Sequence, residues 1–384
     1  MKVLIIFQIE HYTNIQNSPV LRTQLGGIIK QVTKAKKKVI LISNDKKSFI
    51  TKQEYFKEIE HVKIDSCSSS LLIYLRSILA LYKIIRREKI SGNKVKVYAR
   101  NIYSGILMSI INKFTNISCI YDTRGDFIAE SFFSNPKRKW YIYFLEFFEK
   151  KTIISSDTCC FVTNELKKTV FKRHSLLEEN LLSKGKKILI IPSCAEVMEP
   201  IKEVSNDKYH LVYSGGISQY QCIEPMLKIW KELEIISSEF KFSFLTSRRN
   251  TNSVNALVHK EQIKNIRIYS FENDCDLNEY LNNCSYGFLL REENGVNRVA
   301  SPVKFSEYLR SNLKVITTNG LKDISEKVTK KRLGIIIDLN HSASSTAALI
   351  YNFIKKDNLN KNSFEVFENH YSFKSHYNIY NEYF

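Results

Sequence analysis

No run of apolar residues in this chain approaches the roughly 18 that a membrane-spanning helix needs. The segment Met1–Phe7 has the lysine and the apolar residues of a signal peptide. Its apolar run is too short, however, and the polar residues Gln8 and Glu10 follow at once. We therefore expect a buried first strand at Val3–Phe7 and no transmembrane segment.

Cysteine and histidine patterns that build disulfide or metal frameworks are also missing. The eight cysteines include no C-x-x-C pair and are scattered, apart from the neighbours Cys159 and Cys160. This spacing indicates free thiols in a reducing compartment. The eight histidines form no metal-ligand motif, so we expect neither a metal nor a cofactor.

Acidic residues are scarce in one half of the chain. Residues 1–200 carry 34 Lys and Arg against 18 Asp and Glu, a net charge of +16, whereas residues 201–384 carry 24 against 21, a net charge of +3. The first half is expected to favour an anionic surface, such as acidic lipid headgroups or a lipid-linked phosphate. We do not expect nucleic acid as a partner, because no nucleic-acid-binding motif accompanies the charge. A solvated surface with no partner is the alternative.

The order of apolar and polar segments predicts an α/β fold in two domains. A length of 384 residues suits two cores. The polar stretch Glu196–Lys208 contains Pro200 and is the expected linker. Short apolar runs alternate with helical patterns, which predicts parallel sheets covered on both faces. The expected strands are Val3–Phe7, Val39–Ser43, Lys94–Ala99, Ile117–Tyr121, Thr158–Thr163, Ile188–Ile191, Tyr209–Tyr213, Phe242–Thr246, Ile266–Phe271, Tyr286–Leu290 and Ile335–Asp338.

Charged side chains follow two of the strands expected in the first half. Arg100 ends one of them, and Asp122, Arg124 and Asp126 follow the next one. Ligands bind at the C-terminal ends of strands in open α/β sheets, so all four residues are candidates for ligand contact. A structural ion pair between Asp122 and Arg124 at the sheet edge is an equally good explanation of that pair.

Two segments of the first half combine apolar and basic residues. Leu71–Ile90 is a strongly apolar helix pattern with basic flanks, and Phe132–Phe148 places eight aromatic residues beside Lys137–Lys139. Aromatic and basic residues together suit a bilayer interface or a lipid-linked ligand. Packing of both segments against the sheet explains them at least as well.

The stretch Arg291–Arg310 organises the second half. Ser301 and Pro302 predict a helix start, since Ser caps free N–H groups and Pro suits the first helical position. Lys304 lies in the first turn, where a cation opposes the helix macrodipole unless an anion binds there. Glu307 follows on the same face. A lysine and a carboxylate one turn apart suit a nucleoside diphosphate, and an ordinary surface helix start is the alternative.

The motif Ser301–Leu309, followed by Leu313–Thr318, resembles the signature of nucleotide-sugar glycosyltransferases with the GT-B fold. It is more narrowly similar to family 4 members that build bacterial surface polysaccharides, which carry a Pro-x-Lys-x-x-Glu-Tyr helix followed by a strand. The resemblance implies two Rossmann-like domains facing across a cleft. Residues 1–200 would form the acceptor domain and residues 208–360 the nucleotide-sugar donor domain. Residues 361–384 would form a helix that crosses back to the first domain.

The resemblance also implies roles for single residues. Lys304 would bind the diphosphate and stabilise its departing charge, and Glu307 would hydrogen-bond the nucleotide ribose. Gly215 and Gly216 end a strand, where glycines let a ligand approach backbone N–H groups. Further donor-binding candidates are Arg248, Arg291, Gly295, Val296, Asn297, Ser301 and Pro302, and the acceptor-side candidates are Arg100, Asp122, Arg124 and Asp126.

The chain departs from the family pattern at two places that bear on the donor. Relatives place an Arg and a Lys just after the strand-end glycines, and the corresponding segment here has neither. We therefore expect Arg248 or Arg291 to support Lys304. Val299 occupies the position of a sugar-contacting Glu in relatives, so the sugar is expected to meet the loop Glu292–Arg298 instead.

These features together predict a cytoplasmic glycosyltransferase, peripheral at the inner face of the cell membrane. It would move a sugar from a nucleotide-diphosphate donor to a lipid-linked or growing surface-polysaccharide acceptor of a capsule, O-antigen or exopolysaccharide. The resemblance implies retention of the anomeric configuration and no metal ion, since protein cations can neutralise the leaving diphosphate. Two alternatives stay open: a nucleotide-sugar 2-epimerase of the same fold, and a catalytically inactive scaffold that binds a sugar nucleotide or a membrane.

Overall fold

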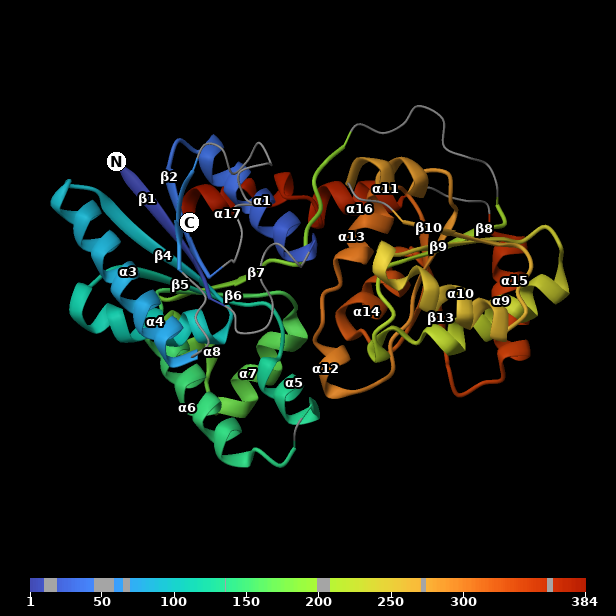
Figure 1. The fold of residues 1–384 in the computed structure, drawn as a ribbon, viewed down its shortest axis with the longest axis horizontal. Helices are drawn as coiled ribbons and strands as arrows, with labels where there is room; N and C mark the ends of the chain where they lie inside the picture. Colours follow the sequence, from blue (N-terminus) through green and yellow to red (C-terminus); the bar gives the residue numbers. More distant parts are fainter. Residues whose placement is uncertain are drawn as a thin grey trace. The chain divides into compact units, whose positions relative to one another are not determined.

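The computed structural model describes residues 1–9, 19–44, 59–64, 70–134, 136–198, 208–270, 274–357 and 362–384. The chain divides into two compact units, which we call unit 1 (residues 1–196 and 373–384) and unit 2 (residues 197–372). Each unit is a parallel sheet flanked by helices (Figure 1). The expected linker Glu196–Lys208 lies largely outside the described residues. None of the described helices is long and apolar enough to cross a bilayer.

Unit 1 is built on seven parallel strands in the order β3-β2-β1-β4-β5-β6-β7. The order in which successive strands are added to the sheet reverses between the parallel neighbours β1 and β4, a point that we call the sheet reversal. In a Rossmann-like unit the ligand crevice lies beyond the C-terminal ends of these two strands. The apolar strand interiors are buried, because helices cover the sheet. The strands are β1 (Lys2–Gln8), β2 (Lys38–Ser43), β3 (Glu60–Lys63), β4 (Lys94–Arg100), β5 (Ser118–Thr123), β6 (Thr158–Phe161) and β7 (Lys187–Ile190).

The helices of unit 1 follow the strands in alternation. The aromatic segment Phe132–Phe148 is split between two of them, α5 and α6. The expected apolar helix Leu71–Ile90 is α3, and it packs on α4. The helices are α1 (Pro19–Lys34), α3 (Ser70–Ile90), α4 (Ile102–Thr115), α5 (Phe127–Ser134), α6 (Lys139–Ser155), α7 (Asn164–His174), α8 (Glu178–Leu182) and α17 (Tyr377–Tyr383).

The last residues of the chain complete the core of unit 1. The side chains of Phe373, Tyr380 and Phe384 are buried in the cluster that lies between the sheet and α1. A Cβ atom at Gly27 in α1 would collide with the ring of Phe373, so this glycine serves close packing. The helix α16 (Ser363–His370) packs on α13 in unit 2, and the return to unit 1 therefore begins at Phe373 rather than at residue 361.

Unit 2 repeats the same plan with six parallel strands in the order β10-β9-β8-β11-β12-β13. Counted from its own first strand, this is again the Rossmann order 3-2-1-4-5-6, with the reversal between β8 and β11. The expected α/β class with two Rossmann-like domains is thereby confirmed. The strands are β8 (His210–Ser214), β9 (Lys241–Leu245), β10 (Ile266–Tyr269), β11 (Tyr286–Leu289), β12 (Lys314–Thr318) and β13 (Gly334–Ile337).

The core of unit 2 is rich in aromatic rings. Trp230 stacks on Phe242 at 5.0 Å between ring centroids, and Phe288 meets the same indole edge-on at 5.6 Å. These rings hold α9 against the middle of the sheet, which fixes the strand ends where the candidate site lies. The helices of unit 2, besides α16, are α9 (Ile223–Ile236), α10 (Thr251–Lys260), α11 (Asp274–Leu281), α12 (Gly295–Arg298), α13 (Val303–Arg310), α14 (Lys322–Lys331) and α15 (Ala343–Lys356).

Candidate functional site

The sheet reversal in unit 2 brings three chain segments to one place. The strand β8 ends at Ser214 and runs into Gly215, and its neighbour β11 runs into Arg291. The helix α13 begins just beyond these two strand ends and packs on β11. Its N-cap residue is Pro302, and no side chain caps it, so the expected cap by Ser301 with Pro302 as the first helical residue is wrong.

Lys304 is the central side chain of this place. It lies in the first turn of α13 and is only 9% exposed. Its Nζ donates to Tyr213 Oη at 2.8 Å and to Gln221 Oε1 at 2.7 Å, and it sits 4.1 Å from the centre of the Tyr213 ring. The lysine therefore points inward toward the end of β8 instead of out to solvent, where a surface lysine would extend.

Arg291 joins Lys304 through a shared acceptor. Its Nη1 donates to Gln221 Oε1 at 2.7 Å and to the carbonyl oxygen of Leu290 at 3.0 Å. Gln221 lies in the short 3-10 turn η2 (Gln219–Gln221), which comes just after the strand-end glycines. One amide oxygen thus holds two cations side by side at the sheet reversal.

The two cations carry charge that the described part of the chain does not neutralise. Every hydrogen-bond acceptor that it offers to them is a neutral oxygen. Burial lowers the pKa of Lys304 well below its usual value, the positive charge of Arg291 lowers it further, and the charge of Glu307 opposes both effects. Burial also lowers the pKa of Arg291. Positive charges held this way, in a medium of low dielectric constant, favour an anion.

Gly215 is required by the position of Lys304. A Cβ atom at Gly215 would collide with Cε and Nζ of Lys304, and the φ angle of +145° is one that other residues rarely adopt. At Gly216 the nearest atom to an added Cβ is Nδ2 of Asn250 at 4.0 Å, which is ordinary contact. The first glycine therefore makes room for the lysine, while the second leaves space open.

Tyr308 ties the same helix to both strands. It lies one turn after Lys304, and its hydroxyl accepts from the backbone N–H of Ser214 at 2.9 Å and donates to the carbonyl of Phe288 at 3.2 Å. Its ring lies where a side chain at Gly287 would otherwise stand. Sequence reasoning noted this tyrosine only as part of the motif, and the structure gives it the role of positioning the turn that carries Lys304.

The loop Glu292–Arg298 is held by its own side chains. Asn294 Oδ1 accepts from the N–H of Asn297 at 2.8 Å, and the buried Asn297 amide donates to the carbonyl of Glu292 at 2.9 Å. Gly295 begins the short helix α12 and has open space around it. Val299, which stands where relatives carry a Glu, is 1% exposed. The structure thus assigns Asn297 to shaping the loop, and Glu292 and Glu293 are exposed on it.

The other donor-side candidates lie around this centre without a described hydrogen bond to Lys304. Glu307 is half-buried, one turn along α13 from Lys304. Arg248 is exposed in the turn η3 (Arg248–Asn250) at the C-terminal end of β9, and the same turn brings Asn250 beside Gly216. Val296 is half-buried within α12, and Ser301 and Pro302 are half-buried between α12 and α13.

The acceptor-side candidates of unit 1 are engaged with their own unit. Asp122 accepts from the Tyr98 hydroxyl and lies 3.6 Å from the guanidinium of Arg124, as the structural alternative predicts. Arg124 also donates to Gln24 Oε1 and Ser193 Oγ, each at 3.2 Å. Asp126 forms an ion pair with Arg173, and the buried Arg100 lies opposite Asp122 in the β4–β5 register. These contacts fix the C-terminal edge of the unit 1 sheet.

Among the residues that the structure describes, no group of three or more His, Cys, Asp and Glu side chains has a geometry that could hold a metal ion. The six described cysteines with free thiols are all buried.

Comparison with known proteins identifies the fold of the chain. No protein-family model matches the sequence, and neither does any curated protein. Among solved structures, a glycosyltransferase from Rickettsia africae matches 99% of this chain and 98% of its own, with a TM-score of 0.69 and 15% identity. The chain has the GT-B fold. WaaG, a glycosyltransferase involved in lipopolysaccharide biosynthesis, matches with a TM-score of 0.66 and 11% identity over 99% of this chain and 100% of that one.

Two further solved structures match over nearly the whole chain. HepE of Anabaena in complex with UDP matches with a TM-score of 0.68 and 9% identity over 99% of this chain and 98% of that one. A putative UDP-N-acetylglucosamine 2-epimerase from Listeria monocytogenes matches with a TM-score of 0.61 and 10% identity over 98% and 94%. At these identities the likeness concerns the fold.

Proposed function

We propose that this chain is a glycosyltransferase that takes a sugar from a nucleoside-diphosphate donor bound to unit 2. The observation that carries the proposal is the pair of buried cations, Lys304 and Arg291, which share the neutral acceptor Gln221 at the sheet reversal. A diphosphate supplies the negative charge that this pair lacks, and it would meet the open backbone at Gly216. The match to a UDP-bound GT-B structure supports the same donor class.

The chemistry expected of this pair is stabilisation of the leaving group. When the glycosidic bond to the donor breaks, negative charge develops on the diphosphate. Cations that already point at that position lower the barrier without reorganisation, and loss of one such group typically costs about 100- to 1000-fold in rate. Glu307 would bind the ribose one turn further along α13. We propose that this transfer retains the anomeric configuration and needs no metal ion, so excess EDTA should leave the rate unchanged.

The proposed acceptor is lipid-linked or a growing surface polysaccharide of a capsule, O-antigen or exopolysaccharide. The net charge of +16 on residues 1–200 supports an anionic acceptor and peripheral contact with the inner face of an anionic membrane. The aromatic residues exposed on α6, which include Trp140 and Phe147, support contact with a bilayer interface.

The test of the donor site is a thermal-shift screen with UDP, GDP, CMP and their common sugar conjugates. A ligand that binds only the folded state raises its melting temperature. We expect one diphosphate to stabilise the wild-type protein and to leave Lys304→Ala unchanged, after which its sugar conjugate is the donor to use in transfer assays. If no diphosphate stabilises the wild-type protein, the proposed donor site is wrong.

Epimerisation is the second candidate function, because one matched structure of the same fold is a putative 2-epimerase. The two reactions differ in their products. An epimerase converts the sugar nucleotide without any acceptor, whereas a transferase releases free nucleoside diphosphate. Incubation with the donor alone, followed by separation of sugar nucleotides, detects epimerisation, whereas release of the nucleoside diphosphate by transfer needs an added acceptor. Binding of the donor with no epimerised product, no hydrolysis and no transfer to an added lipid-phosphate acceptor would identify an inactive scaffold.

A further inference from the structure

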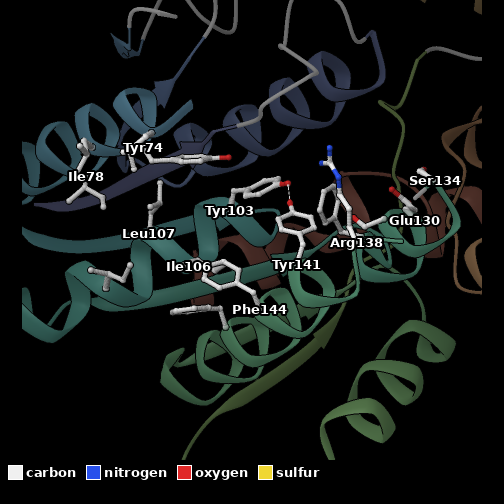
Figure 2. A pocket seen from close by; sticks show the side chains of 16 residues that line it. Tyr74, Ile78, Tyr103, Ile106, Leu107, Glu130, Ser134, Arg138, Tyr141 and Phe144 are labelled. Atoms are coloured by element: carbon white, nitrogen blue, oxygen red, sulfur yellow. Dashed lines mark hydrogen bonds between the residues drawn. The ribbon is translucent and has the colours of Figure 1, made fainter. Parts of the chain in front are cut away.

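Unit 1 contains a pocket of about 690 Å³ between α3, α4, α5 and α6 (Figure 2). Its wall is largely hydrocarbon. Six aliphatic side chains of α3 and α4 line it, and aromatic rings of α3, α4, α5 and α6 complete the wall. The aliphatic residues are Leu71, Leu75, Ile78, Ile106, Leu107 and Ile110. The volume falls in the range of sites that hold a small-molecule ligand.

Several side chains of this wall are exposed to water although they are apolar. Leu71 is 65% exposed, Leu75 49% and Phe144 47%. Contiguous apolar surface of this kind is uncommon on soluble proteins and marks a binding surface. Because α3 and α6 both contribute exposed residues at the rim, a ligand that covers them gains hydrophobic contact on both sides.

The pocket is polar at one end only. Figure 2 shows Glu130, Ser134 and Arg138 together at one end, well away from Ile78 and Leu107. Arg138 and Glu130 are the charged residues of the lining at this end, while Lys137 and Lys139 flank Arg138 in the sequence and lie outside the lining. Although Glu130 is exposed, the surrounding protein and the charge of Asp126 raise its pKa to about 7, which leaves much of this carboxyl group neutral near neutral pH.

The hydroxyls of Tyr103 and Tyr141 hydrogen-bond to each other between the two ends (Figure 2). One of the two hydroxyls donates its proton in this bond, and both rings belong to the pocket wall. A ligand that matches the apolar end of the pocket and the end with Arg138 has a hydrocarbon chain and an anionic head. A wholly apolar helix of a partner protein would leave the cationic end unmatched.

We propose that this pocket binds the hydrocarbon chain of a phosphate-bearing lipid, with the phosphate beside Arg138. That this lipid is the anchor of the glycosyl acceptor rests on the proposed function, whereas the binding itself does not. The proposal distinguishes a site for one chain from general adsorption of unit 1 to a membrane surface.

The test uses dodecyl phosphate, below its micelle concentration, as a probe for one chain and one phosphate. The chain has two tryptophans, of which Trp230 is buried in unit 2 and Trp140 is 73% exposed. The Trp140 ring lies 6.0 Å from that of Tyr141, which lines the pocket, so its fluorescence reports binding. Each buried methylene contributes about fourfold in affinity, and decyl phosphate should therefore bind about 15-fold more weakly. Equal affinities would overturn the proposal.

Matched variants separate the pocket from the surface around it. Phe144 and Phe147 lie on α6 with similar exposure, 47% and 54%, but only Phe144 lines the pocket. Leu75 and Leu72 form the same kind of pair on α3, at 49% and 46%, with Leu75 in the lining. We expect Phe144→Gln and Leu75→Gln to weaken dodecyl phosphate binding at least tenfold, and Phe147→Gln and Leu72→Gln to change it less than twofold. An equal effect within each pair would overturn the proposal.

Arg138→Gln tests recognition of the phosphate head. This variant should bind dodecyl phosphate more weakly and dodecanol as tightly as the wild-type protein does. Lys139→Gln, outside the pocket lining, is the control. Vesicles of phosphatidylglycerol form the other arm. If they bind the protein while dodecyl phosphate does not, this face contacts a membrane and holds no single chain, which overturns the proposal. The thermal shift with UDP reports on unit 2 alone, so failure of the donor site and failure of the lipid site are seen separately.

Discussion

Arg291 and Lys304 donate hydrogen bonds to the same atom, Oε1 of Gln221, and both distances are 2.7 Å. Two cations are thus held together by one neutral oxygen, in a place where burial lowers the pKa of each. Such an arrangement costs stability in the unliganded protein, because both cations are buried and each donates only to neutral oxygens among the described residues. An anionic ligand compensates these charges when it binds. Removing one of the cations should therefore stabilise the unliganded protein and weaken binding of the ligand.

Replacing Lys304 with methionine should therefore stabilise the unliganded protein by about 1 kcal/mol, because a similar volume is kept and a buried charge is removed. The same change should abolish the thermal shift caused by the diphosphate and slow the proposed transfer by about 100- to 1000-fold. Thermal melting with and without nucleotide measures both effects.

The matched control is Lys314→Met in the same unit. Lys314 is also buried, but it forms an ion pair with Asp357. Its removal leaves that carboxylate without its cation and should destabilise unit 2 by about 3 kcal/mol, while the nucleotide-dependent shift is kept. If both variants lose the shift, the effect of Lys304→Met reflects damage to unit 2 and the proposed role of Lys304 is wrong.

Gln221→Glu should turn the shared acceptor into an internal anion. A carboxylate at this place would pair with both Arg291 and Lys304, so the unliganded protein should melt at a higher temperature. The diphosphate would then compete with a fixed negative charge, and its affinity should fall about tenfold or more, which corresponds to about 1.4 kcal/mol. Calorimetric titration measures the affinity. An unchanged affinity would place the diphosphate elsewhere.

Gly215→Ala should disturb the site through Lys304. The added Cβ would collide with Cε and Nζ of this lysine at a backbone angle that alanine rarely adopts, so we expect a loss of about 1–3 kcal/mol in stability and of the nucleotide shift. Gly216→Ala is the control, since its added Cβ has an ordinary neighbour at 4.0 Å. A similar loss in both variants would show that the glycines serve the turn and not the lysine.

Much of the fold follows from the sequence because the strands are short, continuous apolar runs. The runs Val3–Phe7 and Tyr286–Leu290 lie within a residue or two of β1 and β11, since a strand buried on both faces must be apolar throughout. The break of the aromatic segment Phe132–Phe148 into α5 and α6 could not be read in this way. Pro136, Lys137 and Arg138 lie between the two helices, and a proline beside charged residues is a helix-break signal that the expectation of one continuous aromatic segment overlooked.

Charged residues of the candidate site could be predicted from the sequence, because a charge in an unusual position is visible there. Lys304 and Arg291 were candidates on that ground, and the structure brings them together. Gln221 was not predicted as a site residue, because nothing in a single sequence distinguishes one neutral amide from another. Its position at the site depends on the turn η2. Arg124 was also a candidate because of its charge, but the structure places it in contacts within unit 1. Its partners Gln24 and Ser193 are 100 and 69 positions away in the sequence, so these contacts could not be predicted.

Binding of the diphosphate should take up a proton at pH values between the lowered pKa of Lys304 in the free protein and its higher pKa in the complex. In the unliganded protein, burial and Arg291 lower the pKa of Lys304, so a fraction of the lysine is neutral well below its usual pKa. A bound diphosphate favours the ammonium form and raises this pKa. Between the free and bound values, binding is coupled to protonation, and the affinity falls as the pH rises, by up to tenfold per pH unit.

Calorimetric titration with UDP in two buffers of different ionisation enthalpy measures this uptake. The apparent binding enthalpy should differ between the buffers for the wild-type protein, and the difference should grow as the pH rises toward the free pKa of Lys304. It should be absent from Lys304→Arg, whose guanidinium stays protonated and has no proton to gain, and present in Lys314→Met. Uptake that persists in Lys304→Arg would assign the proton to another group, and the buried lysine would then not be the charge that meets the diphosphate.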